Sequence, residues 1–137
     1  MNKNPFIFFI FIILLIQSCE LNAPTLTGRS VERKLQAEGL SVTRLQDTIE
    51  LEDGLSSKEK SECLNVIQKE IEAQICLYRY PSSRQAIEAG TKAGLKPWPA
   101  GKTRRSFVSG VVYVTFSADK NQGAFLERLA VLLQNIE

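Results

Sequence analysis

The pattern of hydrophobic and polar positions divides the chain into one apolar run near its N-terminus and a series of short amphipathic segments after it. Residues 29–40 place Val31 and Leu35 four positions apart, on one face of a helix. Gly39 stands where the end of a helix needs a left-handed residue, so that Leu40 can fold back on Leu35. This pattern predicts a short helix over residues 29–40.

The next two segments predict strands, although one of them also fits a helix. Residues 43–51 alternate between apolar and polar positions, as in a strand with one buried face. Residues 56–74 fit either a helix that begins at a capping box or a hairpin that reverses near residues 68–70. We favour the hairpin, because it places Cys63 and Cys76 opposite each other, close enough to bridge.

Two clear elements follow in the middle of the chain. Residues 74–80 are rich in branched and aromatic side chains and predict a strand, which Pro81 ends. Ser82 and Gln85 form a capping box that begins the next helix, and this helix ends near Gly94 in the same way as the first ended near its own glycine.

The last third of the chain predicts a loop, a strand and a helix. Residues 96–105 read as a basic loop stiffened by two prolines, and residues 106–116 are nearly continuous in apolar side chains, as in one central strand covered on both faces. Asp119 then caps a final amphipathic helix. The order α-β-(hairpin or α)-β-α-β-α predicts an α+β fold, a small mainly antiparallel sheet with helices packed on one face.

The apolar run near the N-terminus fits a secretory signal better than a membrane span. Lys3 precedes the run, which extends from Phe6 to Ile16 and is followed by small and polar residues. Eleven residues form a helix of only ~16 Å, whereas the hydrocarbon core of a membrane is ~30 Å thick. We therefore expect this segment to be a signal peptide.

The end of this segment resembles the lipobox of bacterial lipoproteins. Ile16, Gln17, Ser18 and Cys19 provide in order the aliphatic, variable, small and cysteine positions of that motif. The resemblance implies cleavage after Ser18, a diacylglyceryl group on the Cys19 sulfur, and further acylation, for example with palmitate. Two or three acyl chains hold a protein firmly on a membrane without spanning it. Because residue 20 is Glu rather than Asp, the resemblance implies the outer membrane if the organism has one.

The expected organisation is therefore a signal peptide, a tether and one domain. Residues 1–18 form the signal peptide, residues 19–28 form the tether, and residues 29–137 form a single α+β domain.

A second resemblance concerns the mature chain. In residues 31–133 the order of a tyrosine-bearing strand, a helix, a tryptophan-bearing loop, a glycine-containing apolar strand and a closing helix is similar to a group of small uncharacterised bacterial lipoproteins. The resemblance implies the fold and carries no activity with it. Its most specific residues are Tyr78, Tyr80, Trp98, Gly110 and Tyr113.

The cysteine count agrees with export. The chain has three cysteines, and if lipid takes Cys19, the other two, Cys63 and Cys76, are free to pair. Such a disulfide closes a loop of about 14 residues and could stabilise the domain by ~3 kcal/mol. The alternative is that both remain buried, unpaired thiols. With no histidine in the chain, no metal site is expected.

Composition argues against nucleic-acid binding and against most catalytic chemistry. The formal net charge of +2 lacks the strongly basic character of a nucleic-acid-binding domain. The absence of histidine removes the usual general base. We therefore expect no enzyme activity and no cofactor.

One basic segment is a candidate surface for a ligand or a partner. Trp98 lies between two prolines, and Lys102, Arg104 and Arg105 follow it closely, so that together they could grip an anionic envelope component, a lipid headgroup or a protein partner. Alternatively, Trp98 packs over the core and the basic residues are simply solvated. The expected function is a lipid-anchored cell-envelope protein with a non-enzymatic binding or accessory role. An inhibitor or exclusion-type lipoprotein and a small envelope hydrolase are the alternatives.

Overall fold

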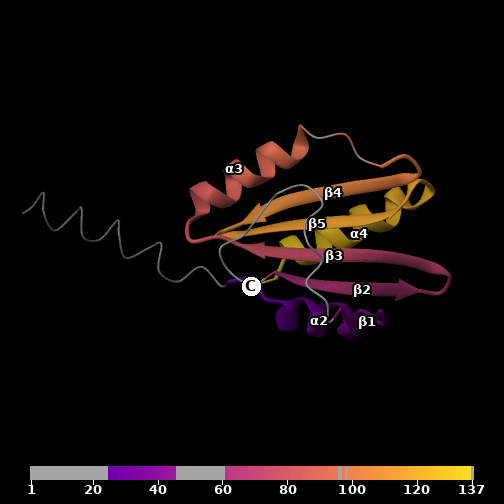
Figure 1. Cartoon of the computed structure of the whole chain (residues 1–137). Coiled ribbons are helices and arrows are strands. Elements are labelled where there is room, and N and C mark those ends of the chain that lie inside the picture. The colour runs from indigo at the N-terminus through magenta and orange to yellow at the C-terminus, as the bar shows by residue number, and fades with distance from the viewer. Residues whose placement is uncertain (1–24, 46–60, 96, 98, 137) are drawn as a thin grey trace, which may run out of the picture.

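The described part of the protein folds around one antiparallel sheet (Figure 1). The structure is a computed structural model, described for residues 25–45, 61–95, 97 and 99–136. Within these residues the sheet has the strand order β1-β2-β3-β5-β4, and the predicted α+β class is confirmed. The elements are α2 (Gly28–Ala37), β1 (Ser41–Arg44), β2 (Glu62–Gln68), β3 (Ile71–Arg79), α3 (Ser83–Gly94), β4 (Lys102–Ser109), β5 (Val112–Asp119), the short 3-10 helix η2 (Lys120–Gln122) and α4 (Gly123–Gln134).

The helices lie on both faces of the sheet, so the expectation that they pack on one face is wrong for α3. Val114 and Phe116 of β5 point into a main core shared with α2 and α4, whereas Tyr113, between Val112 and Val114, points to the opposite face and packs with α3. The physical reason is that β3 and β5 have runs of consecutive buried residues. A strand that buries both of its faces needs cover on both sides.

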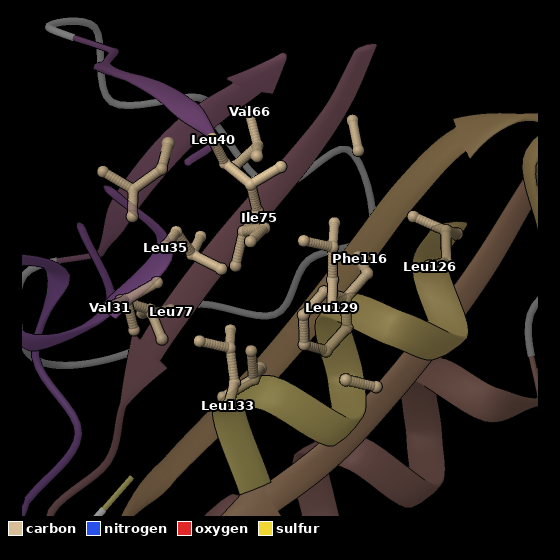
Figure 2. Packing of buried hydrophobic residues seen from close by; sticks show 14 of the residues in the cluster. Val31, Leu35, Leu40, Val66, Ile75, Leu77, Phe116, Leu126, Leu129 and Leu133 are labelled. Carbon is tan, nitrogen blue, oxygen red and sulfur yellow. The ribbon is translucent and has the colours of Figure 1, made fainter. Parts of the chain in front are cut away.

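The main core fills the space between the sheet and the pair α2 and α4. Figure 2 shows side chains of α2 beside those of β3, with side chains of α4 next to them. This core includes fully buried residues from both helices and from the three central strands, since aliphatic side chains at helical spacing meet the alternate positions of each strand. Its members include Val31, Leu35, Leu64, Ile75, Phe116 and Leu129.

Helix α2 ends as its sequence predicts, and it begins at a capping box that was not predicted. The Thr27 hydroxyl accepts a hydrogen bond from the backbone N–H of Ser30, and the Ser30 hydroxyl accepts one from the backbone N–H of Thr27, which completes a capping box. At the other end Gly39 has a φ of 79°, and the Leu40 N–H donates to the Leu35 carbonyl at 3.1 Å. Leu40 thereby folds back into the main core.

The hairpin prediction for residues 56–74 is confirmed in its described part. β2 pairs along its whole length with residues 71–77 of β3 in antiparallel register, and the chain reverses at Lys69 and Glu70. Residues 56–60 lie outside the described residues, as do residues 46–51 of the strand predicted after α2. The observed strand there is β1, which ends at Arg44.

The prediction of one strand over residues 106–116 is wrong, because the chain reverses inside that segment. Gly110 has a φ of 56° and forms with Val111 a two-residue turn between β4 and β5. β4 begins at Lys102, so part of the predicted basic loop is strand. The predicted cap at Asp119 is also absent, since Asp119 makes no side-chain capping bond and α4 begins only at Gly123.

Candidate functional site

The predicted basic surface is divided between the two faces of the sheet. Lys102, Arg104 and Arg105 all lie in β4, where successive side chains point to opposite faces. Arg104 reaches α3 on one face, and Arg105 reaches α4 on the other. The structure therefore brings Lys102 and Arg104 to the same face and separates Arg105 from them. Trp98, the fourth residue of the predicted surface, lies outside the described residues.

Arg104 binds the end of helix α3. Its Nη2 donates a hydrogen bond of 2.8 Å to the backbone carbonyl of Ala93, in the last turn of the helix. The last carbonyls of a helix have no partner within it and carry partial negative charge, so a guanidinium at this point stabilises the helix end. Arg104 therefore has a structural role in holding α3 to β4.

The other two basic residues of β4 form ion pairs. Lys102 Nζ lies 2.8 Å from Asp119 Oδ1, directly across the β4–β5 pair. Arg105 Nε pairs with Glu127 of α4, and its Nη1 donates to the Arg104 carbonyl. These side chains are largely exposed, so each pair contributes at most about 1 kcal/mol. Asp119 and Glu127 also offset the positive charge of this strand.

Cys63 and Cys76 form a disulfide between β2 and β3. The two residues are direct partners in the strand register, with their Cα atoms 4.2 Å apart. This spacing is close to the ~4.5 Å typical of antiparallel partners that do not exchange backbone hydrogen bonds, where side chains approach most closely. Both cysteines are buried on the face that carries α3. Cys19 lies outside the described residues.

A group of tyrosines beneath α3 is a feature that the sequence analysis did not assign to a site. We call this group the α3 cluster. The ring centroids of Tyr78 and Tyr113 lie 6.0 Å apart in a stacked arrangement, and Tyr80 is buried beside them. A sequence signal was present, since tyrosines two apart in a strand share a face and alanines three or four apart share a side of a helix. The cluster comprises Cys63, Cys76, Tyr78, Tyr80, Ala86, Ala89, Ala93 and Tyr113.

The hydroxyl groups of this cluster are in an unusual environment. Neither the Tyr80 nor the Tyr113 hydroxyl has a hydrogen-bond partner among the described residues, although both are buried. Burial raises the pKa of Tyr80 above its ordinary value, and the nearby Tyr113 adds to the shift. Tyr80 is therefore a neutral hydrogen-bond donor throughout the physiological pH range.

The described residues contain neither a cluster of metal-binding side chains nor a helix able to span a membrane. Across residues 25–45, 61–95, 97 and 99–136, no group of three or more metal-binding side chains lies together. In the same part of the chain, no helix is both long and apolar enough to cross a membrane.

Comparison with known protein families, with curated proteins and with solved structures finds no match for this chain. The geometry described above therefore stands without a homologous site beside it.

Proposed function

We propose that this protein is a bacterial lipoprotein of the cell envelope, held on a membrane by lipid on Cys19, with a non-enzymatic binding or accessory role. The observation that carries the proposal is the cysteine arithmetic. The chain has three cysteines, and the pairing of Cys63 with Cys76 leaves Cys19 as the remaining one. That cysteine comes directly after the apolar run and the residues Ile16-Gln17-Ser18, in the position that a lipobox requires.

The disulfide supports export in a second way. Structural disulfides persist in oxidising compartments such as the periplasm or the cell surface and are rare in the cytosol. A signal peptide is the route to such a compartment. If the organism has an outer membrane, Glu20 favours that membrane as the destination.

Three features support a binding or accessory role rather than catalysis. The chain has no histidine, which is the side chain most often used as a general base. Several of the described carboxylates have structural partners, with Glu62 on a helix N-terminus and Asp119 and Glu127 in ion pairs. A partner with anionic groups would meet Lys102, whose side chain is half exposed on the face of the sheet that carries α3.

Metabolic labelling with a palmitate analogue tests the anchor directly. The full-length chain, expressed in a bacterial host, is expected to incorporate the label and to remain in washed membranes. Cys19→Ser is expected to lose the label entirely, because the thioether can form only on a sulfur atom. The control is the double variant Cys63→Ser/Cys76→Ser, which should keep the label. A labelled Cys19→Ser protein would contradict the proposed anchor.

Crosslinking in intact cells tests the binding role. We expect the wild-type protein to be recovered with a small set of envelope proteins or glycans, and Lys102→Glu to reduce that recovery more than Arg105→Glu, because Arg105 lies on the other face. Equal recovery with both variants would remove the Lys102 surface from the proposal.

A further inference from the structure

The hydroxyl groups of Tyr80 and Tyr113 are buried beneath α3. Tyr80 and Tyr113 are only 8% and 1% exposed, and no described residue offers either hydroxyl a hydrogen bond. A buried polar group without a partner lowers stability, and native proteins keep very few of them. Phenylalanine would fill the same space at both positions without that cost. The pair therefore points to a use other than packing.

The two hydroxyls belong to one site rather than to separate parts of the core. Both residues belong to the α3 cluster, and Tyr113 also stacks on Tyr78. Tyr78 pairs with Tyr113, and the Tyr80 N–H donates to the Val111 carbonyl, so Tyr80 and Tyr113 are diagonal neighbours on one face of the paired strands. An oxygen atom between them could accept a hydrogen bond from each, since a phenol hydroxyl donates one proton.

The helix over this site makes a weak cover. α3 faces the tyrosines with Ala86, Ala89 and Ala93, whereas Ile87 in the helix and Leu95 directly after it are 56% and 83% exposed. Burial of alanine side chains removes little apolar surface from water, and the stabilisation is proportional to that surface. Elements with few buried apolar contacts open at lower free energy than the rest of a fold. α3 therefore buries less apolar surface against the sheet than α2 and α4, whose buried residues include valine, leucine and phenylalanine.

We propose that the Tyr80 and Tyr113 hydroxyls bind a small, neutral, largely apolar molecule through one carbonyl oxygen, and that α3, whose Gly90 lies against the Tyr113 ring in this structure, moves outward to make room for it. The carbonyl oxygen has two lone pairs and accepts a hydrogen bond from each hydroxyl. No buried residue in the described part of the chain is charged, so a carboxylate beside the two hydroxyls would lose its hydration without gaining a buried counter-ion, at a large cost. Aromatic and alanine side chains provide the apolar walls that small-molecule sites commonly have.

Benzamide is the probe for this site, and benzoate is its charged counterpart of similar shape. The experiment uses the purified full-length chain with 13C-labelled tyrosine rings, and follows the ring signals by NMR as each probe is added. We expect benzamide to shift the Tyr80 and Tyr113 signals saturably and benzoate to bind at least tenfold more weakly. Absence of a saturable shift with benzamide up to its solubility limit would overturn the proposal.

Three conservative variants separate a binding role from a structural one. Tyr80→Phe and Tyr113→Phe should each weaken benzamide binding about threefold to tenfold, the usual effect of one neutral hydrogen bond. Without benzamide, both should raise the midpoint of thermal unfolding, because each removes an unpartnered hydroxyl. Tyr78→Phe, the same change in the same cluster, should raise neither the midpoint nor the dissociation constant.

The opposite result is equally clear. If Tyr80→Phe and Tyr113→Phe lower the unfolding midpoint and leave benzamide binding unchanged, the hydroxyls are structural and the site does not exist. These measurements do not depend on whether Cys19 carries lipid, so their failure would leave the proposed anchor unaffected.

Discussion

The ring of Tyr113 lies against the backbone of Gly90, so close that a Cβ on Gly90 would be 3.2 Å from the ring carbons Cδ2 and Cε2. Gly90 is in the middle of α3, and Tyr113 is in the central part of the sheet. The absence of a side chain at residue 90 is therefore what lets α3 approach the sheet and cover the tyrosines. The first prediction follows from this contact.

Gly90→Ala should destabilise the protein even though alanine favours helices. The gain in helix propensity is about 1 kcal/mol, but overpacking a buried contact costs about 1–3 kcal/mol, and Tyr113 has no room to move because it is fully buried. Gly94→Ala is the matched control, since a Cβ there meets nothing within 4 Å. Urea unfolding followed by circular dichroism should show a lower midpoint for Gly90→Ala alone. Equal midpoints for the two variants would mean that α3 can shift freely.

Loss of the disulfide should cost about 3 kcal/mol of unfolding free energy. The bond joins residues 13 apart in sequence, and a loop of about that length loses roughly this much conformational free energy in the unfolded chain when it is closed. The measurement compares urea unfolding of the wild type with that of Cys63→Ala/Cys76→Ala. Reductant should lower the wild-type midpoint and leave that of the double variant unchanged. If reductant added to the fully unfolded wild type leaves its unfolding midpoint unchanged, the two thiols are not bridged.

Glu62 should contribute to stability through the N-terminus of α2. Its Oε2 accepts a hydrogen bond of 2.9 Å from the Gly28 N–H, which is at the positive end of the helix dipole. Glu62→Ala should lower the unfolding free energy by about 1–2 kcal/mol. Glu62→Gln keeps an acceptor but loses the charge, so its loss should be about half as large and should depend less on salt. Identical losses for the two variants would show that the charge, and not the acceptor, provides the whole effect.

Lys69→Gly should stabilise the β2–β3 hairpin. Lys69 has a φ of 57°, the one non-glycine residue in the described part of the chain with a positive φ. Side chains raise the energy of this conformation by about 1–2 kcal/mol, so glycine should gain about 0.5–1 kcal/mol after its larger unfolded-state entropy is counted. Glu70→Gly, one residue further in the same turn and outside the left-handed region, should lose stability instead. Thermal unfolding of the two variants should therefore shift in opposite directions.

Tyr80 should make the protein sensitive to alkaline pH. Its pKa in the folded protein is raised by burial and by Tyr113, whereas in the unfolded chain it is about 10. Above that pH the unfolded chain releases the Tyr80 proton more readily than the folded one, so stability falls as pH rises from about 10 towards the folded pKa. Below that range Tyr80 is protonated in both states and makes no pH-dependent contribution.

Unfolding midpoints measured between about pH 9 and 11.5 should decline less steeply for Tyr80→Phe than for the wild type. If the unfolding midpoint of Tyr80→Phe declines with pH as steeply as that of the wild type, the pKa of Tyr80 is not raised in the folded protein.

Local patterns were sufficient for several elements. The glycine at the end of α2, the reversal between Gln68 and Ile71, and the Ser82 cap of α3 are all visible in the sequence, and each is found in the structure. Such signals work because capping and turn formation depend on residues within about four positions of one another. The hairpin register that opposes Cys63 and Cys76 follows from the same local geometry.

The β4–β5 reversal was not predicted, because its sequence signal is weak. Residues 106–116 are almost all apolar or β-branched, so the run fits one buried strand as well as two. A single glycine provides the turn, and Gly110 takes the positive φ that a two-residue hairpin requires. Only the pairing of β4 with β5 over eight residues reveals that Gly110 is a turn residue rather than a bulge.

By itself the sequence determined the local elements, the lipobox resemblance and the set of residues able to form a disulfide, because each of these depends on neighbours in the chain. Only the tertiary structure decided that α3 covers the face opposite α2 and α4, and that Arg104 bonds to α3 while Arg105 bonds to α4. It also decided that two tyrosine hydroxyls are buried in the same cluster. The physical reason is that strand order sets which residues meet across the sheet. That order depends on contacts between segments far apart in the chain, which periodicity does not encode.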